Sequence, residues 1–166
     1  QLVRDIDSVD VWARRRESAE AYAERMRALG LAVNVHDGVR AACEQADIIV
    51  TTTPAREPIL TARDLPEGVH VTAMGSDSPE KRELDEEVMT RADAFVCDTR
   101  AQSENNGELK AFIKGAGQDT HRRSAGTGAD RELPFKVYEL GRVIAEGQHC
   151  LLDTSDAADD LLCVDL

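Results

Sequence analysis

The chain has 166 residues, of which 42% are hydrophobic and 31% charged, and its formal net charge is −12. This length is sufficient for one domain with a substantial core. The excess of carboxylates repels phosphate backbones and anionic lipid, which argues against nucleic-acid and membrane partners. No apolar stretch approaches the ~20 residues needed to span a bilayer, and the first residues do not have the pattern of a signal peptide. Four widely separated cysteines favour free thiols in a cytoplasmic protein.

Short β-like runs alternate with helix-like segments along the chain. We expect strands at residues 9–12, 31–35, 48–50, 69–74, 94–97 and 161–164. The expected helices cover residues 18–29, 39–46, 83–92, 100–114 and 135–146, and residues 115–131 are expected to be a loop. Because parallel strands need long crossover connections, this alternation predicts an α/β fold with a doubly wound parallel sheet of the Rossmann type.

Small and hydroxyl-bearing residues follow two of the expected strands. Thr51, Thr52 and Thr53 come after the apolar run at 48–50. The segment from Ala73 to Asp77 covers the end of the run at 69–74 and the residues directly after it. Ligands of doubly wound sheets bind outside the carboxyl ends of the strands, so a cofactor could approach closely here. An alternative is that the threonines are only β-formers and that Asp77 caps the next helix.

Trp12 ends the first expected strand, and Ala13 and Arg14 follow it. In dinucleotide-binding folds, the residue after the second strand meets the adenosine ribose. An acid there binds the 2′-hydroxyl, whereas an arginine suits a 2′-phosphate. We therefore expect these three residues to contact the cofactor, and Arg14 favours NADP over NAD. The alternative is a solvated basic patch that opens the following helix.

A glycine-rich phosphate loop is not evident. The run from Gly115 to Thr120 begins like the G-x-G-x-x-G fingerprint, but it lacks the third glycine and follows an expected helix, so the match is weak. The sequence also shows no Ser/His/Asp set, no P-loop and no spacing of metal ligands, and we expect no metal site.

Four blocks of sequence resemble one family. They are ADIIVTTTPA (46–55) with PIL (58–60), HVTAMGSDSPEKREL (70–84), the sparse pattern of Asp98, Gln102 and GEL (107–109), and ELGRVIA (139–145). The residues of these blocks and their order along the chain resemble those of the ornithine cyclodeaminase/mu-crystallin family. The motif TAMGSD is most similar to the branch of ectoine-utilisation proteins, which includes iminosuccinate reductase-like enzymes.

The resemblance implies an enzyme that binds NAD(H) or NADP(H) and interconverts small amino acids and imines by hydride transfer. An imine reductase or amino-acid dehydrogenase is the leading interpretation. The alternatives are an ornithine cyclodeaminase, which releases ammonia, and a non-catalytic, mu-crystallin-like binding protein. Among the matched positions, Asp77 corresponds to the family's catalytic aspartate. The cofactor-contacting positions are Thr52, Thr53, Met74 and Gly75, with Lys81 near the nicotinamide.

The resemblance also implies parts of the family that do not match these 166 residues. The first Rossmann strand with its glycine-rich loop is expected before Gln1, and the N-terminal substrate and dimerisation domain is expected further upstream. We therefore expect residues 1–166 to be a partial dinucleotide-binding domain of a protein that forms a homodimer.

Overall fold

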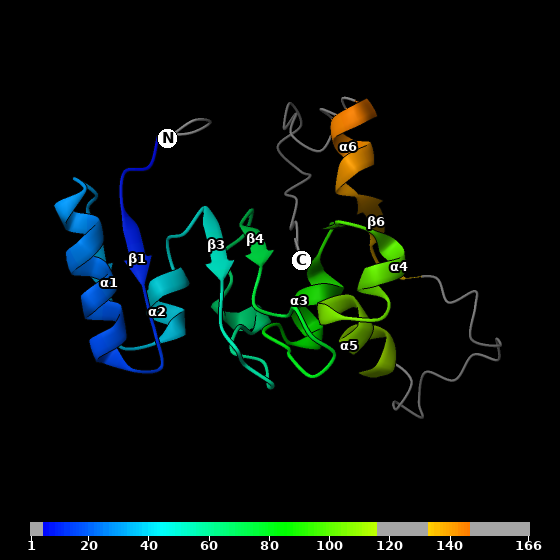
Figure 1. The fold of residues 1–166 in the computed structure, drawn as a ribbon, viewed down its shortest axis with the longest axis horizontal. Coiled ribbons are helices and arrows are strands. Elements are labelled where there is room, and N and C mark those ends of the chain that lie inside the picture. Colours follow the sequence, from blue (N-terminus) through cyan, green and yellow to red (C-terminus); the bar gives the residue numbers. More distant parts are fainter. Residues whose placement is uncertain (1–4, 116–132, 147–166) are drawn as a thin grey trace. The chain divides into compact units, whose positions relative to one another are not determined.

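The computed structural model describes residues 5–115 and 133–146 (Figure 1). The chain forms two compact units. The first contains the residues up to Ala46 together with Arg63–Pro66, and the second contains Asp47–Ala62 and the residues from Glu67 onward.

The first unit is a strand–helix–strand–helix segment. Strand β1 (Val9–Val11) leads into α1 (Arg16–Ala28), followed by β2 (Val33–Val35) and α2 (Val39–Cys43). β1 and β2 pair in parallel, with Val9 opposite Val33. Helix α1 buries Ala19 and Ala23. The chain leaves this helix through Gly30, whose φ of 88° is accessible to glycine at little cost.

The second unit contains two further parallel strand pairs. Its strands are β3 (Ile48–Thr51), β4 (His70–Ala73), β5 (Ala94–Cys97) and β6 (Lys136–Glu139), and β3 pairs with β4 and β5 with β6. Its helices are α3 (Glu86–Arg91), α4 (Arg100–Ser103), α5 (Gly107–Gly115) and α6 (Leu140–Glu146). A short 3-10 helix, η1 (Ala62–Asp64), precedes β4 in the sequence, and its residues are divided between the two units.

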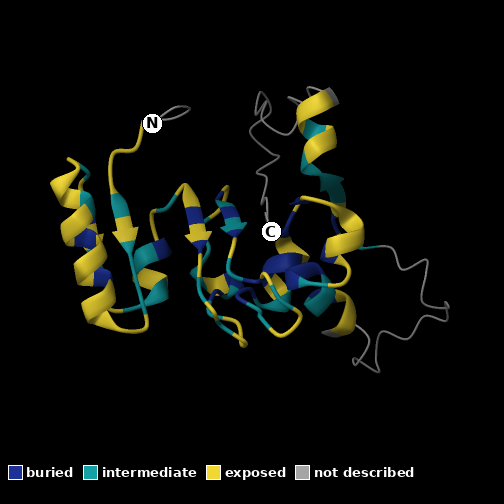
Figure 2. Cartoon of the chain, viewed as in Figure 1, coloured by how far each residue is buried: buried dark blue, intermediate teal, exposed yellow. Residues whose placement is uncertain are grey.

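The core of the second unit lies around α3 and β5. Val88 and Met89 of α3 and all four residues of β5 are buried, as are Leu60 and Leu84. Figure 2 shows the colour of buried residues concentrated around α3. The β3–β4 pair contributes alternate residues to the buried side, as the period of two of a strand requires. These are Ile49, Thr51, Val71 and Ala73.

All strand pairs in the described part of the chain are parallel, which confirms the predicted Rossmann-type α/β class. The pairs are three separate two-stranded ladders, with β1 next to β2 and β3 next to β4. No helix within the described ranges is long and apolar enough to cross a membrane.

The observed helices differ from the predicted ones in their bounds. The helix predicted at 18–29 is α1 (Arg16–Ala28), and the helix predicted at 39–46 ends at Cys43. The helix predicted at 83–92 begins only at Glu86, since the side chain of Asp85 caps it by accepting hydrogen bonds from the N–H groups of Glu87 (2.6 Å) and Val88 (3.3 Å). The helix predicted at 100–114 is divided into α4 and α5, and Gly107 adopts a φ of 69° between them.

The prediction of one helix over 135–146 was wrong, because its first third is strand β6. Residues 136–139 pair with β5, from Ala94 opposite Lys136 to Cys97 opposite Glu139. Phe135 is buried just before the strand, with its ring centroid 6.0 Å from that of Phe95 and 5.3 Å from that of Phe112. Of the apolar residues whose spacing suggested a helix here, Val137 belongs to the strand, whereas Leu140 and Ile144 lie in α6. The predicted strand at 161–164 and nearly all of the predicted loop at 115–131 lie outside the described residues.

Candidate functional site

The carboxyl ends of β3 and β4 lie side by side. Thr51 is opposite Ala73 in the last pair of the ladder, and the N–H of Met74 donates to the carbonyl of Thr51 at 2.8 Å. The segments that follow therefore leave the sheet at the same edge, where ligands of such folds bind. Thr52 and Met74 are exposed there and Thr53 is half-buried. The structure thus brings together the residues that the sequence analysis selected after these two strands.

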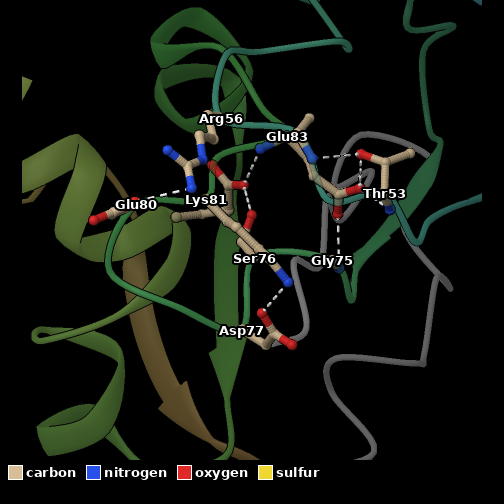
Figure 3. Close-up of polar contacts among 10 residues, drawn as sticks. Thr53, Arg56, Gly75, Ser76, Asp77, Glu80, Lys81 and Glu83 are labelled. Carbon is tan, nitrogen blue, oxygen red and sulfur yellow. Dashed lines mark hydrogen bonds and ion pairs between the residues drawn. The ribbon is translucent and has the colours of Figure 1, made fainter. Parts of the chain in front are cut away.

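The buried carboxylate of Glu83 joins the two strand ends (Figure 3). Its Oε1 accepts hydrogen bonds from the N–H (2.5 Å) and the hydroxyl (2.6 Å) of Thr53. Its Oε2 accepts from the hydroxyl of Thr51 (2.7 Å) and from the N–H of Gly75 (2.8 Å). Four donors thus compensate for the removal of this carboxylate from water.

Gly75 is required by the closeness of the two strand ends. A Cβ at this position would overlap the carbonyl oxygen of Thr53 and would lie 2.5 Å from the carboxyl carbon of Glu83. Any larger residue would therefore push the segment after β4 away from Thr53 and Glu83. The close approach also brings the N–H of Gly75 within hydrogen-bond distance of the Glu83 carboxylate.

A second buried carboxylate, that of Glu108, supports the first. It lies in the first turn of α5, where it accepts from the hydroxyl of Ser76 and from the N–H of Glu83 (2.6 Å). Burial raises the pKa of Glu108 above its ordinary value. Hydrogen bonds from Ser76 and from the backbone of Glu83 and Leu84, together with the charge of Arg82, oppose this rise in pKa.

Asp77 and Lys81 form an ion pair at the exposed side of the site. Lys81 Nζ lies 2.5 Å from Asp77 Oδ1, and the Asp77 side chain is 68% exposed (Figure 3). The alternative that Asp77 caps the next helix was wrong, because Asp85 is the N-cap of α3. Asp77 is therefore a solvent-facing carboxylate beside the strand ends, paired with Lys81.

The predicted adenosine-contacting residues belong to the first unit. Trp12 and Ala13, which follow β1, are partly exposed, and Arg14 is exposed. The neighbouring Arg16 is engaged by the carboxylates of Glu20 (2.8 Å) and Asp37. Arg14 and Arg15 are both exposed.

Two other sequence observations have a limited structural counterpart. Gly115 ends α5, and the rest of the weak glycine-rich match lies outside the described residues. Among the described residues, no group of His, Cys, Asp and Glu is arranged to hold a metal ion.

Glu83 and Glu108 were not predicted from the sequence as functional residues. Both lie within the blocks that carried the family resemblance, and each is followed by a buried leucine, Leu84 or Leu109. An acidic residue directly before a core residue is a weak signal of a buried carboxylate, since most such residues lie on the solvated face of a helix.

Parallel strand pairs with helical crossovers, and small residues at adjacent strand ends, define a domain of the Rossmann type. Residues 1–149 match the ornithine cyclodeaminase/mu-crystallin family, and the chain belongs to that family.

Several known proteins are similar to this chain. An uncharacterized cyclodeaminase of Sinorhizobium fredii is 43% identical over 145 residues, which cover 87% of this chain and 40% of that protein. The ketimine reductase mu-crystallin of Mus musculus is 37% identical over 101 residues, covering 61% of this chain and 31% of that protein. The chain thus spans about two fifths or less of the length of these relatives.

Solved structures show the same likeness. The iminosuccinate reductase of Paracoccus denitrificans in complex with NAD+ superposes with a TM-score of 0.74 at 26% identity, over 99% of this chain and 44% of that one. An archaeal alanine dehydrogenase dimer with bound NAD has the same TM-score, identity and coverage.

Proposed function

We propose that this chain is the dinucleotide-binding part of an NAD(P)-dependent oxidoreductase that acts on small amino acids or imines. The observation that carries the proposal is the shared edge of β3 and β4, where Glu83 holds Thr53 and Gly75 together beside the exposed carboxylate of Asp77. The names of the relatives, which include a ketimine reductase and an iminosuccinate reductase, support the same reaction class.

The residues at this edge suit a dinucleotide. Thr52 is exposed, and Met74 is 53% exposed, which gives a ring an apolar surface to lie against. Thr52, Thr53, Met74 and Gly75 would hold the nicotinamide half, with Lys81 nearby. When bound, the nicotinamide supplies or accepts the hydride.

Asp77 is the proposed acid–base residue. Its carboxylate faces solvent, so it can reach a substrate nitrogen or a water molecule, and Lys81 restricts its orientation. A carboxylate in this position takes a proton from an amine or from attacking water and returns it in the reverse direction. Proton transfer of this kind contributes roughly 10²–10⁴-fold to a rate.

Arg14, together with Trp12 and Ala13, is proposed to contact the adenosine half of the cofactor. An exposed guanidinium favours a 2′-phosphate and hence NADP. The solved relatives contain NAD+ and NAD, so both cofactors belong in the test.

A second candidate function is an ammonia-releasing cyclodeaminase, which is favoured by the name of the relative at 43% identity. The two reactions differ in the net consumption of the cofactor. A reductase consumes one NAD(P)H for each imine reduced, whereas a cyclodeaminase regenerates the cofactor within each turnover.

We further propose that residues 1–166 are a partial dinucleotide-binding domain, and that a separate N-terminal domain of the complete protein binds the substrate and forms a homodimer. The archaeal alanine dehydrogenase, which is a dimer, supports this assembly.

The test uses the complete protein that contains this segment. NADH and NADPH oxidation is followed with pyruvate plus ammonia and with a cyclic imino acid, and ammonia release is measured with L-ornithine. Imine-dependent oxidation of NAD(P)H supports the reductase, and ornithine-dependent ammonia release without net cofactor consumption supports the cyclodeaminase. Binding of a dinucleotide with neither reaction would favour a non-catalytic binding protein, and no dinucleotide binding would refute the proposal.

A further inference from the structure

We propose that Glu83 is a positioning residue, whose buried carboxylate fixes the ends of β3 and β4 relative to each other and so shapes the cofactor edge. The inference rests on the proposed function for what the edge binds. The contacts that carry it are independent of any ligand.

The carboxylate takes the place of further ladder hydrogen bonds. At the end of the ladder, the N–H of Met74 donates a hydrogen bond to the carbonyl of Thr51 at 2.8 Å. Beyond it, the N–H of Thr53 and the N–H of Gly75 both point to Glu83, at 2.5 Å and 2.8 Å. They use different oxygens, so the rigid carboxylate group spans from one strand end to the other.

Glu83 is itself held at both of its peptide groups. Its N–H donates to Glu108 Oε1 at 2.6 Å, and its carbonyl accepts from the N–H groups of Ile59 (2.8 Å) and Leu60 (3.0 Å). The residue is 0% exposed. A side chain with no exposed surface does not touch a substrate, so its role is exerted through Thr53 and Gly75.

The two backbone N–H donors at the strand ends require a carboxylate at position 83. Each oxygen of Glu83 accepts one backbone N–H, and a backbone N–H cannot reverse its role. A glutamine offers one acceptor and one donor group, so in either orientation its NH2 would face the N–H of Thr53 or that of Gly75. Glu83→Gln therefore leaves one buried donor without its acceptor, although the two side chains have nearly the same size.

The test compares Glu83→Gln with a matched control, Glu87→Gln, in the complete protein. Glu87 is an exposed residue of α3. Amide hydrogen exchange of Thr53 and Gly75 is measured without cofactor, and the Kd for NADH and NADPH is measured by titration. In Glu83→Gln, we expect exchange at one or both amides to accelerate at least tenfold and the Kd to rise about tenfold, the factor that corresponds to 1.4 kcal/mol. The control should change neither.

The exchange pattern separates positioning from general loss of stability. Positioning predicts acceleration at the amide of Thr53, of Gly75 or of both, with the amides of Phe95 and Val96 in β5 unchanged. Equal acceleration in β5, or unchanged exchange at both strand-end amides, would overturn the inference. If the unmutated protein binds neither NADH nor NADPH, the proposed function fails, and the exchange result still decides the role of Glu83.

A milder variant serves if Glu83→Gln does not fold. Thr51→Val removes one hydroxyl donor from Oε2 and keeps the size of the buried side chain. It should accelerate exchange at Gly75 by a smaller factor, about threefold, because the shared oxygen is less firmly held. No acceleration would contradict the proposal.

Discussion

The ammonium group of Lys81 lies 2.5 Å from Oδ1 of Asp77, four residues earlier in the chain. The pair is at the exposed side of the strand-end site, and the Lys81 side chain is 28% exposed whereas that of Asp77 is 68% exposed. An exposed ion pair contributes little to folding stability. We therefore expect the function of the pair to be seen in catalysis rather than in a melting curve.

Replacing Asp77→Asn in the complete protein removes the base and keeps the size of the side chain. We expect kcat to fall by at least about a hundredfold, the lower end for a lost acid–base group, with the Kd for the cofactor nearly unchanged. Steady-state kinetics and a melting curve are the measurements. Near-normal turnover would remove Asp77 from the reaction.

Lys81→Met tests whether the lysine acts through Asp77. On the unmutated background, we expect a fall of about tenfold in kcat, within the 0.5–3 kcal/mol range of coupling between contacting residues. On the Asp77→Asn background, the same substitution should have little further effect, because its partner is already lost. Additive effects on kcat would instead indicate that Lys81 has a separate contact with cofactor or substrate.

Gly75→Ala should lower both stability and cofactor affinity. The added Cβ overlaps the Thr53 carbonyl and lies 2.5 Å from the Glu83 carboxyl carbon, so the strand ends must separate. Overpacking of this kind costs about 1–3 kcal/mol in the free energy of unfolding. Gly141→Ala, at a position with nothing within 4 Å of the new Cβ, is the control. Equal denaturation midpoints for the two variants would contradict the close approach at Gly75.

The pH dependence of stability should reveal the burial of Glu108. Its pKa is raised in the folded state above the ordinary value of 4.5, so the folded state holds this proton more tightly than the unfolded state does. The associated stability is fully present below pH 4.5 and is lost as the pH rises through the raised pKa.

Glu108→Gln isolates this contribution, because a neutral amide does not titrate. We expect the free energy of unfolding of the variant, minus that of the unmutated protein, to increase as the pH rises from about 4.5, since other carboxylates cancel in the difference. Denaturant titrations at several pH values measure it. A difference that stays constant with pH would show that the pKa of Glu108 is not raised by folding.

Elements with strong local patterns could be predicted from the sequence. Strands 9–11, 33–35, 48–51, 70–73 and 94–97 are close to their predicted positions, because short apolar runs between turn residues have few other uses. Residues 136–139 were assigned to a helix because Val137, Leu140 and Ile144 have helical spacing. Pairing with β5, about forty residues earlier in the chain, overrode that local pattern.

The sequence by itself determined the alternating α/β order, the parallel class and the small residues at the ends of β3 and β4, because burial periodicity and turn chemistry act over a few neighbouring residues. The tertiary structure alone decided which acids are buried. Glu83 meets Thr51 across 32 positions, and Glu108 meets Ser76 across another 32. A glutamate carboxylate is stable in the protein core only where hydrogen-bond donors surround it, and otherwise it must lie in water. Those donors are assembled when distant segments pack together, and the local sequence around each acid does not contain them.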